Sequence, residues 1–83
     1  MEIVIKKGTI ELKFKYEDFV DCTQTYEGMS FQLKHGLQYY LIDNNMQTMT
    51  KEKIIQTINS FKNAKKITID LFNRANPTMV ELN

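Results

Sequence analysis

Cys22 and His35 are the one thiol and the one imidazole of the chain, and so its first candidates for chemistry. A histidine can activate a cysteine as a nucleophile, and Asp18, Asp21 or Asp43 could orient the histidine as in a cysteine hydrolase. Nothing in the spacing specifies such a triad, and neither a strained turn nor an oxyanion-hole glycine follows the cysteine. We therefore expect a small, buried or half-buried Cys22, a His35 in a surface turn and no catalytic residue.

Metal binding has equally little support. One cysteine and one histidine fall short of the four ligands of a structural zinc site. The segment Asp43-Asn44-Asn45 is similar to the start of a calcium-binding loop, but Thr48 and Ile54 stand where such a loop needs glycine and glutamate. The sequence therefore predicts no metal and no cofactor.

The size and composition bound the remaining possibilities. A chain of 83 residues has room for one domain, and 42% apolar with 25% charged residues is ordinary for a folded protein. The net charge of +1 argues against a strongly basic nucleic-acid binder and against an acidic mimic of nucleic acid. The single cysteine, the lack of a leader after Met1 and the lack of a long apolar run predict a cytoplasmic protein that does not enter a membrane.

The charges are separated into two blocks. The acidic block, residues 17–28, has no basic residue and contains Glu17, Asp18, Asp21 and Glu27. The basic block, residues 51–66, has Glu52 as its one acid and contains Lys51, Lys53, Lys62, Lys65 and Lys66. Two such blocks can complement each other between the subunits of a homodimer, or they can orient a different partner.

Residues 9–16 alternate between polar and apolar side chains, which predicts a strand with one buried and one solvated face. The apolar members are Ile10, Leu12, Phe14 and Tyr16. The segment that starts at Ile3 also reads as a strand, and Lys7-Gly8 between the two suits a tight turn because glycine adopts a positive φ. We expect these two strands to pair antiparallel.

The acidic block loses this alternation and ends at Gly28, so we expect a connection there, with one helical turn around Asp18–Asp21. A second hairpin follows it. Its first strand alternates at Met29, Phe31 and Leu33, its turn is His35-Gly36, and its second strand covers residues 37–42. The cluster Asp43-Asn44-Asn45 then favours a turn that ends the strand.

The helix with the clearest sequence signals begins after Thr50. Thr50 is a suitable N-cap, Glu52 lies in the first turn, where the helix dipole favours acid, and Met49 can pack against Ile54. Lysines at positions 62, 65 and 66 are expected to complement the negative C-terminus. Helical spacing puts the apolar side chains on one stripe that must face the sheet, and these are Ile54, Ile55, Ile58 and Phe61.

Residues 67–71 alternate again, Asn76-Pro77 interrupts them, and a tail at 79–82 can add an edge strand. The order is two hairpins, one helix, then one or two strands. It predicts a single α+β domain over residues 1–83, with a mostly antiparallel sheet and a single helix packed on one face.

The outward side of the helix carries neutral hydrogen-bonding side chains, namely Gln56, Thr57, Asn59, Ser60 and Asn63. A neutral polar face is easier to desolvate than a charged one, so it suits contact with a partner protein. We expect Gln56, Asn59, Ser60 and Asn63 to bind such a partner together with Glu17, Asp18 and Asp21. An open sheet edge offers a second route, through a homodimer or a captured peptide.

Nucleic-acid binding is the alternative, because lysines interleaved with aromatic residues on strands are the parts of a base-stacking surface. The lysines that would serve it are Lys13, Lys15, Lys53, Lys62, Lys65 and Lys66. Alternation places Phe14 and Tyr16 on the core face, and it places Tyr39 and Tyr40 on opposite faces, so that one of these two is exposed. Packing therefore explains the aromatic residues more simply.

The sequence thus favours a non-enzymatic protein-interaction module over an enzyme. The abundance of lysine, isoleucine and asparagine is typical of an AT-rich coding genome. That bias and the small size suit an accessory protein of a phage or mobile element, such as an inhibitor that blocks a host enzyme.

Overall fold

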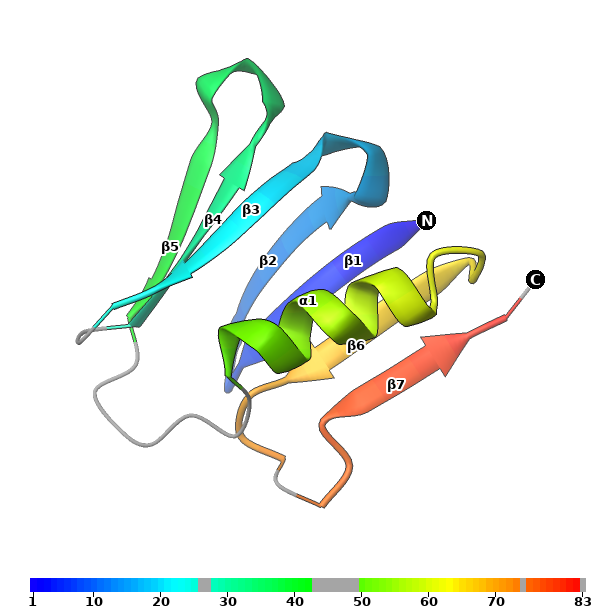
Figure 1. The fold of residues 1–83 in the computed structure, drawn as a ribbon. Helices are drawn as coiled ribbons and strands as arrows, with labels where there is room; N and C mark the ends of the chain where they lie inside the picture. The colour runs from blue at the N-terminus through cyan, green and yellow to red at the C-terminus, as the bar shows by residue number, and fades with distance from the viewer. Residues whose placement is uncertain (26–27, 43–49, 74, 83) are drawn as a thin grey trace.

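The computed structural model describes residues 1–25, 28–42, 50–73 and 75–82. These residues form the strands β1 (Glu2–Lys7), β2 (Ile10–Lys15), β3 (Phe19–Gln24), β4 (Gly28–Leu33), β5 (Gln38–Ile42), β6 (Lys66–Asp70) and β7 (Thr78–Glu81), the helix α1 (Lys51–Ser60), and the 3-10 turns η1 (Tyr16–Asp18) and η2 (Lys34–Gly36). The predicted α+β class is confirmed. The strands are divided between two sheets (Figure 1), where the sequence suggested one.

The larger sheet has the strand order β2-β1-β6-β7. β1 and β2 form the predicted antiparallel hairpin, which closes with Lys7 opposite Ile10. Gly8 in the turn has a φ of +62°, and a side chain added there would meet the ring of Phe72 at 3.1 Å. Both facts explain why the turn uses glycine.

β6 pairs in parallel with the other side of β1, with Ile3 opposite Ile67, and this is the one parallel pair among the described strands. β7 pairs antiparallel with β6 and forms the edge of the sheet, so the predicted tail strand is confirmed. We call the side that carries Ile3 and Ile5 the inner face, because these side chains join the core. The side that carries Val4 is the outer face.

The smaller sheet is antiparallel, with the order β3-β4-β5. The predicted second hairpin is confirmed, and it turns through η2, where His35 and Gly36 both have positive φ. Tyr39 and Tyr40 are both exposed, by 36% and 43%, where the alternation predicted one exposed tyrosine. β5 is an edge strand of this sheet, so the neighbouring strand covers it on one side only.

β3 contradicts the prediction that residues 17–28 form a connection. Phe19 lies opposite Leu33 and Asp21 lies opposite Gln32, so Val20 is an extra residue in a β-bulge. The bulge allows Phe19 and Cys22 to face the core although they are three positions apart, and this removes the alternation that identifies a strand. The helical turn expected around Asp18–Asp21 is displaced: η1 covers Tyr16–Asp18, and residues 19–21 belong to β3.

α1 begins as predicted, because the Thr50 side chain accepts a hydrogen bond from the Lys53 N–H at 3.3 Å. It ends at Ser60, so Lys62 and Lys65 lie beyond its last turn and Lys66 belongs to β6, which corrects their expected place in the helix. Of the predicted stripe, Ile54 and Ile58 are buried, Ile55 is half-buried and Phe61 is exposed beyond the last turn.

One core of buried side chains holds the two sheets and the helix together. Its buried side chains are Ile3, Ile5, Phe14, Cys22, Met29, Phe31, Leu33, Leu41, Ile54, Ile58, Ala64, Ile67, Ile69 and Leu71. None of the helices among the described residues is long and apolar enough to cross a membrane. The predictions for Glu27, Asp43-Asn44-Asn45, Thr48 and Met49 lie outside the described residues.

Candidate partner-binding groove

A groove runs between α1 on one side and η1 with the start of β3 on the other. Its volume is about 370 Å³, and its lining consists of Tyr16, Glu17, Phe19, Val20, Asp21, Lys34, Ile55 and Asn59. We call it the α1–β3 groove. Three segments that are distant in sequence contribute to it, so the fold alone brings these side chains together.

The apolar part of the groove follows from the tight connection between β2 and β3. The ring of Phe19 stacks on Phe14, with ring centroids 5.8 Å apart, so it is held half-buried at the groove. The bulge turns Val20 outward, where it is 57% exposed. Ile55 on α1 is half-buried opposite them. These side chains give the groove an apolar floor that is open to solvent.

The helix face at the groove is formed by Lys51, Ile55 and Asn59, which are spaced by four residues and so lie one above the other. The Tyr16 hydroxyl donates a hydrogen bond to Oδ1 of Asn59 at 3.4 Å. At the other end, Nζ of Lys51 lies 4.0 Å from Oδ1 of Asp21. Weak polar contacts therefore link α1 to η1 and to β3 at the two ends of this face, and Ile55 lies between them.

The Lys51–Asp21 pair joins the two charge blocks within one chain. The backbone N–H of Lys51 also donates to Oε1 of Gln24 at 3.3 Å. Part of the predicted complementarity between the blocks is thus satisfied inside the subunit. Of the other acids of the block that the structure describes, Glu17 is exposed and Asp18 is half-buried.

Glu17 is the fully exposed acid of the groove. A hydrogen bond from its own backbone, with smaller contributions from the amino group of Met1 and from Lys15, keeps the pKa of Glu17 below its usual value. The Met1 amino group lies 3.4 Å from Oε1 of Glu17. The lowered pKa keeps this carboxylate ionised to a lower pH than that of an ordinary glutamate.

The structure brings together three of the residues predicted to bind a partner: Glu17, Asp21 and Asn59 line the α1–β3 groove. Asp18 lies in η1 beside them. Gln56 and Ser60 are exposed on α1 but do not line the groove, and Asn63 lies in the turn after the helix.

Thr57 does not belong to the outward face of the helix, which corrects the sequence analysis. It is buried, and its hydroxyl donates to the Lys53 carbonyl oxygen at 2.7 Å. This contact satisfies the hydroxyl inside the helix, so the Thr57 side chain is not presented on the outward face.

Sequence reasoning missed Tyr16, Phe19, Val20, Lys34 and Ile55, which supply most of the groove. The available signal was the adjacent pair Phe19-Val20 inside an otherwise acidic segment. An apolar pair in such a segment indicates either a core anchor or an exposed contact, and here Phe19 serves the first purpose and Val20 the second.

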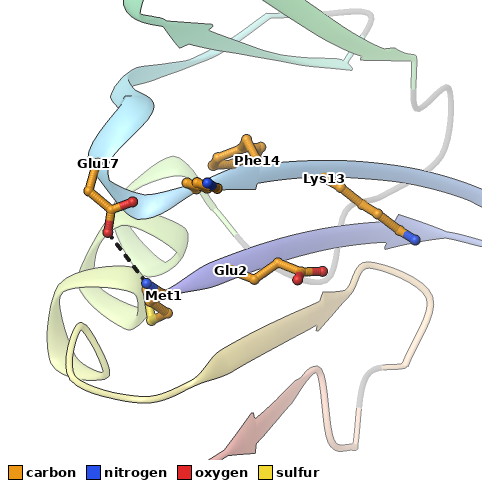
Figure 2. A pocket seen from close by; sticks show the side chains of 6 residues that line it. Met1, Glu2, Lys13, Phe14 and Glu17 are labelled. Atoms are coloured by element: carbon orange, nitrogen blue, oxygen red, sulfur yellow. Dashed lines mark hydrogen bonds and ion pairs between the residues drawn. The ribbon is translucent and has the colours of Figure 1, made fainter.

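A second hollow lies beside the edge strand β2 (Figure 2). Its volume is about 540 Å³, and Met1, Glu2, Lys13, Phe14, Lys15 and Glu17 line it. Its charges alternate in sign, and Figure 2 shows the carboxylate of Glu17 turned toward the Met1 amino group. Lys13 also lies 3.7 Å from Glu11. This mixture of nearby opposite charges gives the hollow no preference for an anion or a cation.

The lysines of the nucleic-acid alternative do not form a continuous basic surface. Register places Lys15, Glu2, Lys66 and Glu81 in one row across the outer face, so Glu2 separates the two lysines and Glu81 follows the second. Lys13 lies in the next row, Lys53 is on the first turn of α1, and Lys62 and Lys65 follow the helix. Phe14, the aromatic residue between Lys13 and Lys15, is buried on the inner face.

Cys22 is fully buried in β3, and burial, followed by the nearby charge of Asp21, raises the pKa of its thiol to about 12. His35 is exposed in η2. A thiol that is inaccessible and protonated is a poor nucleophile, so the structure gives the Cys22–His35 pair no support. Within the described part of the chain, no group of three or more His, Cys, Asp or Glu side chains is placed to hold a metal ion.

No protein-family model, no curated protein and no solved structure matches this chain.

Proposed function

We propose that this protein is a non-enzymatic protein-interaction module that uses the α1–β3 groove. Its ligand is a segment of a partner protein in which an apolar side chain is flanked by lysine or arginine. The apolar side chain occupies the floor, and the basic side chains contact the acidic rim formed by Glu17, Asp18 and Asp21.

The observation that carries this proposal is the composition of the groove. Protein interfaces have an apolar centre surrounded by polar groups, and an aromatic residue is often part of the centre. Here Phe19, Val20 and Ile55 form the centre, while Asn59 and the acids form the rim. A partner that covers the groove removes the exposed part of Val20 from water, which is favourable.

The charge around the groove selects the partner. Glu17 and Asp21 line the groove together with Lys34, its one basic lining residue. Asp18 adds a third acid beside them in η1, and the Met1 amino group lies 3.4 Å from Glu17. The Lys51–Asp21 contact is at the limit of an ion pair and partly exposed, and such pairs contribute at most about 1 kcal/mol. An incoming guanidinium can therefore replace Lys51 at Asp21 with little loss.

The biological setting belongs to the same proposal. A buried free thiol suits a reducing compartment such as the cytoplasm, and the lysine- and asparagine-rich composition suits a phage or mobile-element genome. A module of this kind acts by occupying a surface of its target, so inhibition of a host enzyme is a natural role for it.

A peptide array tests the groove directly. The probe is the labelled protein, and the peptides carry a central leucine flanked by arginine, by serine or by glutamate. We expect binding to the arginine-flanked set. Val20→Lys should reduce this binding by at least about tenfold, because a cation replaces the apolar contact. Leu37→Lys is the matched control, since Leu37 is 55% exposed but is not one of the lining residues, and it should bind like the wild type.

A second measurement separates the proposal from nucleic-acid binding. Wild-type, Val20→Lys and Leu37→Lys proteins are used to capture partners from lysate, with and without nuclease, at low and moderate salt. The proposal expects a protein that resists nuclease and that only Val20→Lys loses. Retained nucleic acid with a steep loss on adding salt would support the lysine-based alternative instead. Equal capture by all three variants would contradict a role for the groove.

A further inference from the structure

The edge of β7 has backbone groups that are free to pair with another strand. The Asp70 N–H donates to the Pro77 carbonyl oxygen, so Pro77 faces β6. Antiparallel bonding alternates along a strand, so Met79 and Glu81 also face β6 with their backbone groups. Thr78 and Val80 therefore direct their N–H and C=O groups away from the sheet, where the described residues place no other strand.

The side chains along this edge are uncharged over residues 77–80. Met79 lies on the outer face and is 67% exposed. Register places Val4, Thr68 and Met79 in one row across β1, β6 and β7. Lys13 of β2 lies opposite Val4 and begins this row, but the part of the row on β1, β6 and β7 is uncharged and ends at the open edge.

We propose that the edge of β7 binds a second copy of this chain, antiparallel, about a two-fold axis at Met79. In this register Thr78 lies opposite Val80 of the second copy, and each exchanges both backbone hydrogen bonds with the other. Met79 lies opposite its own copy as a pair without backbone bonds, the arrangement in which opposite side chains lie closest. The row that starts at Val4 then continues across the axis into the second copy.

A two-fold axis brings a residue that lies on it next to the same residue of the second copy, so the two identical side chains must be able to pack together. Methionine does so, because two exposed thioether side chains can pack together. Glu81 lies opposite Pro77 of the second copy and about 14 Å from its own copy, given about 3.4 Å per residue. At that distance salt screens the repulsion between the two carboxylates. The second copy is therefore the occupant that this edge fits.

Cysteine cross-linking tests the register. Opposite Cα atoms in a pair of this kind lie about 4.5 Å apart, which a disulfide can span. With diamide as the oxidant, Met79→Cys should give a covalent dimer. Glu81→Cys, in the same strand and on the same face, should stay monomeric. Equal cross-linking of the two variants, or no dimer for Met79→Cys, would overturn the proposal.

A concentration series tests the association without a cysteine. Sedimentation equilibrium of the wild type should show a reversible monomer–dimer equilibrium below about 1 mM. Met79→Lys places two cations at the axis and should raise the dimer Kd by at least about tenfold, whereas Leu37→Lys should leave it unchanged. A wild type that stays monomeric up to about 1 mM, or an equal effect of both substitutions, would overturn the proposal.

Discussion

The two edges of the larger sheet differ in what they present to solvent. The free backbone groups of β2 belong to Glu11, Lys13 and Lys15, because Tyr16 donates to Met1 and so faces β1. The free groups of β7 belong to Thr78 and Val80, with Met79 between them. Charged side chains, lysine above all, discourage the addition of another strand. One edge is thus protected by its own sequence, and the other is available.

The smaller sheet protects β3 in a different way. The Cys22 N–H faces away from β4, and it donates to Oδ1 of the neighbouring Asp21 at 2.8 Å. A side chain therefore replaces the strand that would otherwise pair there. Together with the lysines of β2, this shows two local ways to close an edge, and β7 has neither.

The largest predicted effect tests whether the two edges belong to one cooperative unit. Ile5 lies in β1 opposite both Leu12 and Ile69, so it connects the two sides of the sheet. Ile5→Ala should lower the free energy of unfolding by about 2–5 kcal/mol, measured by urea denaturation.

Hydrogen exchange gives the test of cooperativity. Ile5→Val, the milder control, should lower the free energy of unfolding by about 0.5–1.5 kcal/mol and the protection of β2 and β7 amides in parallel. Loss of amide protection in β2 alone would show that the two edges do not belong to one cooperative unit, because β7 would then unfold separately.

The pH dependence of stability sharpens the contrast between the buried and exposed sides of β3. The pKa of the buried Cys22 thiol is raised to about 12, against about 8.5 in an unfolded chain. The contribution of the protonated thiol to the free energy of unfolding is fully present below about pH 8.5. It decreases as the pH rises toward 12, because Cys22 loses its proton at a lower pH in the unfolded chain than in the folded one.

We expect the free energy of unfolding to fall by up to about 1.4 kcal/mol per pH unit between pH 9 and 11. Cys22→Ala removes the thiol and should flatten this dependence, which a comparison of the two slopes reports. Identical slopes would show that other groups cause the loss.

Removing the closure of the β3 edge should have a smaller effect. Asp21→Ala takes the acceptor from the Cys22 N–H and the partner from Lys51, so the free energy of unfolding should fall by about 1–2 kcal/mol. Asp18→Ala is the control, because Asp18 lies in η1 and closes no strand edge. It should change stability by less than about 0.5 kcal/mol. An equal decrease in the free energy of unfolding for both variants would contradict a special role of Asp21 at the β3 edge.

The smallest predicted change in stability tests the β2 edge itself. Lys13→Val should alter the free energy of unfolding by less than about 0.5 kcal/mol, because Lys13 is exposed. It should nevertheless start self-association in light scattering, since it removes the central charge of the protected edge. Lys53→Val, on the exposed side of α1, should not cause self-association. Association of both variants would point to general hydrophobicity and would break the comparison of the edges.

The elements predicted correctly from the sequence are those with a local signal. Gly8 and Gly36 mark the two hairpin turns, and Thr50 marks the start of α1. β3 was missed because the bulge at Val20 destroys the period of two that identifies a strand. Local patterns describe single elements, so one interruption is enough to hide one.

The arrangement of the elements was less predictable. The parallel pairing of β1 with β6 and the division into two sheets depend on contacts between distant segments, which no local period encodes. For the same reason, only some of the residues that line the groove were predicted from the sequence. Asn59 and the acids were predicted because their side chains are polar. Tyr16 and Ile55 were not, because they lie beside Asn59 only in the folded chain.

The parallel β1–β6 pair also sets when this protein can finish folding. During synthesis the β1–β2 hairpin leaves the ribosome first, and the β3–β5 meander can follow, yet β1 gains its second neighbour only after residues 66–70 have been added. Until then Ile3 and Ile5 lie on a strand with one open side. Closure of such a long loop is slow, and exposed strands at this stage invite misfolding. The vulnerable period of the nascent chain is therefore long, and it ends only when β6 emerges.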